Sequence, residues 1–252
     1  MLNLRLLIKT FVGQVQNLWD DFCDFVSQRS THPRNADSQL AGLRYKKLGW
    51  GDGRWTIATD NLDESSIVYS VGVGHDISFD LALIRHFKCT VHAFDPTLLS
   101  KQWLDKQHLP ENFCFHELGL ANYSGSAEFR LPKGHSVSFS MASNVEGNHT
   151  HSAEVRTIEG LMTEFGHENI SVLKIDIEGA EFDLIDDLAR SSHLIDQLLI
   201  EFHDRLVSPD QQRQSLASIE ALEQAGFRLF YVSRRGLEYS FLGPNFFNIQ
   251  RK

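Results

Sequence analysis

Apolar residues follow two different periods along this chain, and the change of period marks its predicted elements. Over residues 1–30 they recur at spacings of three and four, which is typical of one face of a helix. From Ile67 onward, short apolar runs alternate with helical patterns, which predicts βαβ units and a parallel sheet. The predicted strands lie near residues 67–73, 90–94, 113–117, 171–176, 197–202, 227–233 and 245–250. The predicted helices lie near residues 77–87, 98–107, 157–166, 179–190 and 210–225.

This pattern divides the chain into three parts and predicts its fold class. We expect residues 1–30 to form an amphipathic helix, residues 31–66 a linker with a glycine- and tryptophan-rich loop, and residues 67–252 a Rossmann-like domain. The predicted fold is an α/β three-layer sandwich with a mostly parallel seven-stranded sheet and an N-terminal helical extension. The last two strands have no helix between them, so we expect an antiparallel pair at the edge of the sheet.

The apolar stripe of the N-terminal helix needs a partner. Its members are Leu4, Leu7, Phe11, Val15, Leu18, Phe22 and Phe25. We expect the stripe to pack on the domain or on a second subunit, so a homodimer through this helix is one expectation. A helix lying on a membrane surface is the alternative. Asp20, Asp21 and Asp24 disfavour it, because anionic lipids attract a polar face rich in Lys and Arg.

Composition limits the partners and the compartment. The 252 residues carry 24 Lys plus Arg against 33 Asp plus Glu, which disfavours nucleic-acid binding because that binding rests on phosphate neutralisation. The three cysteines, Cys23, Cys89 and Cys114, are scattered, as expected of free thiols in a reducing compartment. No apolar run approaches the roughly 20 residues that cross a bilayer, and we see no signal peptide. We therefore expect a cytoplasmic protein without a transmembrane segment.

A glycine motif follows the first strand of the predicted domain. Gly72 and Gly74 stand between a strand and a helix, where backbone must approach a ligand closely. Ile77 occupies the position of the third glycine of dinucleotide-binding enzymes, so the motif is weak when taken alone. The next strand ends at Asp95, 21 positions after Gly74, which is close to the spacing at which an acidic residue binds ribose hydroxyls. The alternative for Asp95 is a helix N-cap, because a predicted helix follows it.

Acidic residues end a later apolar run. Asp176 and Glu178 follow the strand near 171–176. Because an unpaired charge is costly inside a sheet, we expect them at the carboxyl end, where open α/β sheets bind their ligands. Glu201 and His203 end the next predicted strand. In a parallel sheet these two acidic ends would be neighbours.

Four segments carry a family resemblance. They are Val68-Tyr69-Ser70-Val71-Gly72-Val73-Gly74, Val91-His92-Ala93-Phe94-Asp95-Pro96, Leu173-Lys174-Ile175-Asp176-Ile177-Glu178-Gly179-Ala180-Glu181 and Leu199-Ile200-Glu201. Together they resemble the FkbM-type methyltransferases, a family of class I enzymes that depend on S-adenosylmethionine. The resemblance covers roughly residues 55–205, and the segment 174–181 is its most specific part. It implies S-adenosyl-L-methionine as the cofactor and methyl transfer to a hydroxyl oxygen of a small molecule or a carbohydrate.

The resemblance also implies a set of cofactor-binding residues. The set is Ser70, Gly72, Gly74, Asp76, Asp95, Leu118, Gly119 and Asp176. Leu118 and Gly119 would lie along the adenine. Ser70 stands where the family usually has an acidic residue that holds the amino group of the cofactor, so Asp76 or Asp176 would take over that contact.

Transfer to an alcohol requires a base or a metal ion that removes its proton. The predicted catalytic residues are His203, Asp176 and Glu178, with His203 as the preferred base because an unperturbed histidine titrates near neutral pH. A structural, hydrogen-bonded role for His203 is the equal alternative. The same three side chains would suit Mg²⁺ or Mn²⁺, but a metal site is not the favoured interpretation.

Two other functions are compatible with the same fold. A nicotinamide-dependent oxidoreductase is disfavoured by the missing third glycine and by the acidic strand end. A methyltransferase-like protein that binds without turnover is the second alternative, and Ser70 is the residue that supports it.

Overall fold

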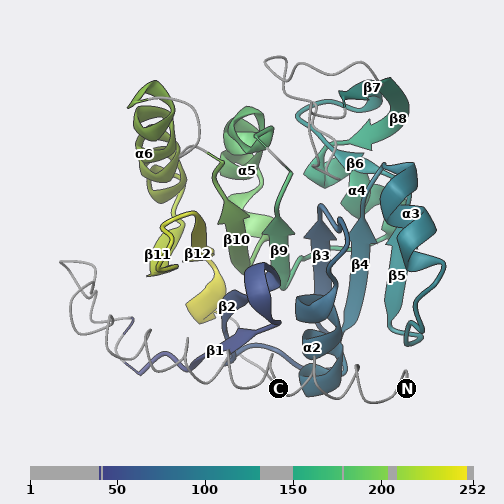
Figure 1. The fold of residues 1–252 in the computed structure, drawn as a ribbon. Coiled ribbons are helices and arrows are strands. Elements are labelled where there is room, and N and C mark those ends of the chain that lie inside the picture. Colours follow the sequence, from purple (N-terminus) through teal and green to yellow (C-terminus); the bar gives the residue numbers. More distant parts are fainter. Residues whose placement is uncertain (1–39, 41, 131–149, 178, 204–208, 249–252) are drawn as a thin grey trace.

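The structure, a computed structural model, describes residues 40, 42–130, 150–177, 179–203 and 209–248. Within these residues seven strands form a sheet of order β11-β12-β10-β9-β3-β4-β5 (Figure 1). Their bounds are β3 Ile67–Val71, β4 Thr90–Phe94, β5 Phe113–His116, β9 Val172–Ile175, β10 Gln197–Glu201, β11 Arg228–Val232 and β12 Glu238–Leu242. The predicted α/β fold with a mostly parallel sheet is confirmed. The helix predicted over residues 1–30 lies outside the described residues.

The centre of the sheet is parallel. β3 pairs with β4 on one side and with β9 on the other, and β9 pairs with β10. Lys174 of β9 lies beside Ser70 of β3 and Leu199 of β10, so the carboxyl ends of these strands meet at one edge. Both faces of the central strands are covered, which explains why their sequences are nearly continuous apolar runs. Because β9 and β10 are adjacent parallel strands, the acidic residues that follow β9 and end β10 are neighbours, as predicted.

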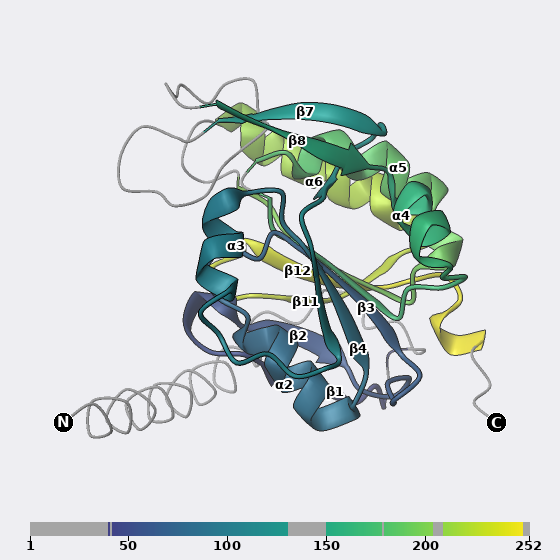
Figure 2. The same ribbon diagram turned by 90° about the vertical axis from the view of Figure 1, so that its right-hand side faces the viewer.

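Helices cover both faces of this sheet (Figure 2). On one face lie α2 Ser78–Phe87 and α3 Leu98–Leu104. On the other lie α4 Ile158–Phe165, α5 Ile185–Arg190 and α6 Pro209–Gln224. The helix predicted near 179–190 is split into a 3₁₀ turn, Glu181–Leu184, followed by α5. Among the described residues no helix is both long and apolar enough to traverse a bilayer.

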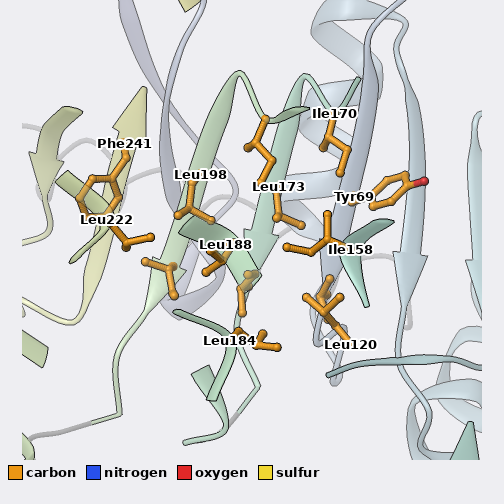
Figure 3. Close-up of a cluster of buried hydrophobic side chains, with 14 of the residues drawn as sticks. Tyr69, Leu120, Ile158, Ile170, Leu173, Leu184, Leu188, Leu198, Leu222 and Phe241 are labelled. Carbon is orange, nitrogen blue, oxygen red and sulfur yellow. The ribbon is translucent and has the colours of Figure 1, made fainter. Parts of the chain in front are cut away.

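Two apolar layers hold the helices to the sheet. The layer under α4, α5 and α6 includes Tyr69, Leu173 and Leu198 from the strands, all completely buried (Figure 3). The opposite layer joins Val91 of β4 to Leu83 of α2. Burying each such side chain contributes about 1.5–3 kcal/mol, so the central strands are fixed from both sides. The site therefore sits on a rigid platform.

A hairpin covers part of the α2 face. Its strands are β1 Tyr45–Leu48 and β2 Trp55–Ala58, which pair in antiparallel fashion. They lie within the 31–66 range that the sequence assigned to a linker and loop. All four residues of β2 are buried, and the side chain of Gln197 bonds both the N–H and the carbonyl of Ala58, at 2.8 and 2.9 Å. The hairpin is thus tied to the sheet by packing and by a buried polar pair.

The strand predicted over 245–250 is wrong. Residues Phe246–Asn248 form a 3₁₀ turn, and the last strand among the described residues is β12, which pairs antiparallel with both β11 and β10. Sequence pattern missed β12 because it buries polar residues. Glu238 pairs with Arg235, and the Ser240 hydroxyl donates to the Thr56 carbonyl at 2.8 Å. Such partners make buried polar groups tolerable, and they are visible only in three dimensions.

A three-stranded sheet lies beyond the carboxyl end of β4 (Figure 1). Within the described residues its strands are β6 Gly119–Leu120, β7 Gly125–Arg130 and β8 Thr150–Arg156, in the order β6-β8-β7. Residues 131–149, between β7 and β8, lie outside the described residues. The small sheet brings Gly119, Leu120 and Phe129 over the main sheet's edge.

Gly72 is the tightest point of the loop between β3 and α2. Its φ is +81°, and a Cβ built there would lie 1.7 Å from the Asp176 carbonyl oxygen. Gly74 also has a positive φ, +53°, but a Cβ there would meet nothing within 4 Å. We expect Gly72→Ala to lower the free energy of unfolding by about 3 kcal/mol or more, because backbone must move. Gly74→Ala, the matched control, should cost about 1–2 kcal/mol.

Urea unfolding of both variants measures this difference. Equal losses of unfolding free energy in the two variants would contradict the close approach of Gly72 to β9.

Candidate functional site

A cavity of about 410 Å³ lies at the carboxyl ends of β3, β4, β9 and β10. Of the residues predicted from sequence, it is lined by Gly72, Gly74, Asp76, Asp95, Gly119, Asp176 and His203. Ser70 is completely buried inside β3, and Leu118 packs against the core, so neither lies on the cavity wall. Glu178 lies outside the described residues. The structure thus brings most of the predicted set together.

Asp95 holds the glycine loop in place. Its Oδ2 accepts hydrogen bonds from the backbone N–H groups of Val73 and Gly74, at 3.1 and 3.0 Å, and from the Ser100 hydroxyl at 2.8 Å. Its Oδ1 accepts from the N–H and hydroxyl of Thr97, at 2.9 and 2.6 Å. Thr97, not Asp95, is the N-cap of α3. Ribose binding by Asp95 stays a prediction, and a ribose would share this carboxylate with its present donors.

The loop after Gly74 carries Asp76. Its Oδ1 accepts a hydrogen bond from the N–H of Ser78 at 2.7 Å. This N–H is one of those at the start of α2 that have no partner within the helix. The remaining oxygen faces Gly53, where an added Cβ would lie 2.4 Å away. Asp76 therefore joins the hairpin loop to the cavity rim.

Lys174 is a buried cation in the cavity wall. It is 6% exposed, although it belongs to the central strand β9. Its Nζ donates to the Gly72 carbonyl at 3.0 Å, lies 3.7 Å from Asp176 Oδ2, and sits 5.4 Å from the centre of the Trp55 ring. A buried ammonium needs such partners. The signal in the sequence is a lysine inside an otherwise apolar strand.

Asp80 is a site residue that sequence reasoning missed. It lies in the first turn of α2, lines the cavity, and is 2% exposed. Its Oδ1 has no hydrogen-bonding partner among the described residues. Burial raises the pKa of Asp80, while the charge of Lys174 and the hydroxyl of Ser70 act in the opposite direction. A carboxylate oxygen left in this state carries a large desolvation cost unless a ligand meets it.

The other end of the cavity gathers three ionisable side chains from two neighbouring strands. His203 Nε2 lies 3.8 Å from Asp176 Oδ1 and 3.9 Å from Glu201 Oε1. The opposite ring nitrogen, Nδ1, is hydrogen-bonded to Glu181, whose side chain is completely buried. Glu181 thereby fixes the orientation of the imidazole. Arg235 Nη2 lies 3.7 Å from Glu201 Oε1, the same oxygen that His203 approaches.

These contacts determine the charge of the cluster. Burial alone would lower the pKa of His203, but the hydrogen bond to Glu181 and the carboxylates of Glu181, Asp176 and Glu201 raise it to about 10. Burial and the charge of Asp176 raise the pKa of Glu201 to about 7, against the opposing charges of His203 and Arg235. The preference for His203 as base rested on an unperturbed pKa. This environment favours the protonated form of His203, and Glu201 keeps its proton to a higher pH than an ordinary glutamate does.

The same cluster has a composition suited to a divalent cation. Among the described residues, one ligand atom each from Asp176, Glu201 and His203 lies within 4.8 Å of the others. The metal set considered from sequence contained Glu178 in place of Glu201. Two carboxylates and one imidazole suit Mn²⁺ or Mg²⁺ better than a sulfur-preferring ion. The cluster can therefore act either as a proton acceptor or as a cation site.

A less polar wall lies between the glycine loop and the small sheet. It is formed by Pro96, Leu120 and Phe129, with Gly119 at its centre. A Cβ at Gly119 would come 3.0 Å from both Phe129 and Val155, so only glycine fits without displacement. A flat ring system would find apolar contacts here.

Comparison with known proteins identifies the family. Residues 61–229, more than half of the chain, match the sequence profile described as the methyltransferase FkbM domain. The chain belongs to the FkbM methyltransferase family. The resemblance inferred from the four sequence segments is thus confirmed, and the FkbM region contains the glycine loop, Asp80, Asp95 and the carboxylate cluster.

Two curated relatives of this FkbM chain have the same name. The human "probable methyltransferase-like protein 24" is 28% identical over 241 residues, which cover 89% of this chain and 60% of that protein. The rat protein of the same name is 29% identical over 190 residues, which cover 72% of this chain and 47% of that protein. The chain therefore spans about half to three fifths of the length of these relatives.

Solved structures are more distant from this FkbM chain. A fibrillarin pre-rRNA processing protein from Methanococcus jannaschii aligns with a TM-score of 0.44 at 12% identity, over 75% of this chain and 70% of that one. Aeropyrum pernix fibrillarin in complex with natively bound S-adenosyl-L-methionine aligns with a TM-score of 0.40 at 9% identity. The alignment covers 81% of this chain and 83% of that one. At these scores the description of the site rests on the FkbM chain itself.

The raised pKa of His203 has a measurable consequence for stability. Because folding raises this pKa above about 6.5, the stabilisation is fully present below that pH and is lost as the pH rises through about 10. Between pH 7 and pH 10.5 we expect the wild-type protein to lose on the order of 3 kcal/mol more unfolding free energy than His203→Gln, measured by urea denaturation. Parallel pH curves for the two proteins would contradict the ionised contact with Glu181.

Proposed function

We propose that this chain is an S-adenosylmethionine-dependent methyltransferase that methylates a hydroxyl oxygen of a small molecule or a carbohydrate. The observation that carries the proposal is the cavity itself: in a chain of the FkbM family, it joins a glycine loop to a cluster of carboxylates at the carboxyl ends of parallel strands. Open α/β sheets bind their ligands at this edge. The net charge of −9 favours a small acceptor over a nucleic acid.

The residues present fit the cofactor. The cavity volume of about 410 Å³ lies within the roughly 300–1,000 Å³ of small-molecule sites. In our assignment Gly72 and Gly74 approach the cofactor, Asp95 takes its ribose, and Gly119 with the neighbouring Leu118 borders its adenine. The acidic lining suits a ligand that is positively charged at sulfur and at nitrogen.

The reaction end is assigned to the cluster of Asp176, Glu201 and His203. The cofactor supplies a methyl group on a positively charged sulfur. Glu201, whose pKa is raised to about 7, accepts the proton of the acceptor hydroxyl near neutral pH. Protonated His203, oriented by Glu181, holds Glu201 and Asp176 in position. Glu178 was assigned to the same end from sequence and stays a prediction.

The proposed compartment is the cytoplasm. Cys89 and Cys114 are both free thiols, and Cys89 is completely buried. Burial raises the pKa of the Cys89 thiol to about 11, so it stays protonated and unreactive. A reducing compartment is compatible with both. A homodimer through the N-terminal helix also stays a proposal.

Isothermal titration of the purified protein with S-adenosylhomocysteine, beside NADH, tests the cofactor. We expect a dissociation constant in the micromolar range for S-adenosylhomocysteine, about −8 kcal/mol of binding free energy, and no heat from NADH. The titration is run on the wild type and on Gly119→Leu. A leucine side chain would displace Phe129 and Pro96, which form the wall beside the proposed adenine position, so binding should fall by at least tenfold.

Three outcomes would overturn parts of this proposal. Binding of NADH alone would favour the oxidoreductase. Binding of neither ligand would remove the cofactor assignment. Tight binding of S-adenosylhomocysteine without methyl transfer from labelled S-adenosylmethionine to any hydroxyl acceptor in a broad screen would favour a protein that binds without turnover.

A further inference from the structure

Two oppositely charged side chains, Asp80 and Lys174, line the cavity, and Lys174 lies beside the Asp176 oxygen that His203 does not approach. Asp80 comes from the first turn of α2, and Lys174 comes from β9. Both line the cavity, and both are almost completely buried, at 2% and 6% exposure. Charged side chains at this depth are retained only where partners offset their desolvation. Lys174 has such partners within the described residues, whereas one oxygen of Asp80 lacks a hydrogen bond of ordinary geometry.

Lys174 has its partners within the chain. Its Nζ bonds the Gly72 carbonyl and lies near Asp176 and the Trp55 ring. An ammonium group has three N–H donors, and among the described residues Lys174 donates one hydrogen bond of ordinary length, to the Gly72 carbonyl. It can therefore accept a further negative group from the cavity side without losing the Gly72 contact.

Asp80 has a buried carboxylate oxygen, Oδ1, that lacks a hydrogen-bond donor of ordinary geometry among the described residues. It forms no such bond although Lys174 and the hydroxyl of Ser70 lie near the carboxylate. A donor arriving through the cavity would satisfy this oxygen, and a positively charged donor would do so most strongly. The environment of this oxygen therefore favours a ligand that offers a positively charged nitrogen donor.

A ligand with an ammonium and a carboxylate on one carbon would match both charges together. A simple cation would be repelled by Lys174, and a simple anion by Asp80. The end of a free α-amino acid carries both charges and is neutral overall, so it fits a buried pair of opposite charges without adding net charge.

We propose that Asp80 and Lys174 bind the amino-acid end of the cofactor, with Asp80 accepting from the α-ammonium and Lys174 donating to the α-carboxylate. This assignment rests on the proposed function, because it takes S-adenosylmethionine as the ligand. It places the amino-acid end between α2 and β9, on the other side of Asp176 from His203. Asp76 and Asp176, which the sequence nominated for the amino group, then keep their contacts to Ser78 and to Lys174.

The test compares ligands that differ only at the amino-acid end. S-Adenosylhomocysteine carries it, and 5′-methylthioadenosine has the same nucleoside and thioether without it. Both are titrated calorimetrically into the wild type, into Asp80→Asn, and into Asp187→Asn. Asp187 is the matched control, because it is a buried aspartate that bonds Arg190 at 2.8 Å and does not line the cavity.

We expect Asp80→Asn to lower the affinity for S-adenosylhomocysteine by about 10- to 100-fold, which corresponds to the loss of one hydrogen bond to a charged group. Its affinity for 5′-methylthioadenosine should change by less than about twofold, because that ligand does not reach Asp80. Asp187→Asn should leave both affinities unchanged.

The outcomes separate this inference from the proposed function. If the wild type binds neither ligand, the proposed function fails. If the wild type binds both and Asp80→Asn weakens them equally or not at all, the cofactor assignment stands and the role of Asp80 is wrong. If Asp80→Asn does not fold, the wild type is titrated with the deaminated analogue of S-adenosylhomocysteine. An affinity equal to that of the parent ligand would also overturn the assignment.

Discussion

The site depends on the close approach of the loop after β3 to the neighbouring strands. Gly72 donates to the Phe94 carbonyl at 3.0 Å, and its own carbonyl receives the Lys174 ammonium. Asp95 binds the next two N–H groups of the loop. A side chain at Gly72 would collide with the backbone of Asp176. The floor of the cavity is thus held by three parallel strands at once, and every residue assigned a role is positioned relative to it.

This arrangement separates two electrostatic environments within one cavity. On one side of Asp176, Lys174 and Asp80 form a buried pair of opposite charges. On the other side, Glu201 and His203 form a cluster whose proton distribution is set by burial and by Glu181. Asp176 touches both, at 3.7 Å from Lys174 and 3.8 Å from His203. Binding and proton transfer can therefore be assigned to different groups that share one carboxylate.

The sequence predicted the parts of this structure that depend on local pattern. The glycine motif, Asp95 and the two acidic strand ends fall where parallel strands must end, so their proximity follows from the fold class. Asp80 and Glu181 were beyond that reasoning for a physical reason. Asp80 lies on the apolar face of α2, three residues after Ile77 and four before Ile84, where pattern alone predicts a core position. Its importance comes from a missing hydrogen-bond partner, which only three-dimensional contacts reveal.

The protonation of His203 was equally hidden from sequence. An isolated histidine titrates near neutral pH, but three carboxylates converge on this one, from the residue after β9, from β10 and from the 3₁₀ turn before α5. The buried strand β12 escaped prediction because Glu238 and Ser240 interrupt its apolar pattern, while Arg235 and the Thr56 carbonyl satisfy them. In both cases residues distant in sequence decide the outcome: they raise the pKa of His203, and they provide partners for the buried polar side chains of β12.

A crystal structure of the chain with S-adenosylhomocysteine would test the central claim most directly. The account predicts the ligand over Gly72 and Gly74, with its ammonium at Asp80, its carboxylate at Lys174, and its sulfur facing Asp176, Glu201 and His203. A ligand bound in the reverse orientation, or bound outside this cavity, would contradict it.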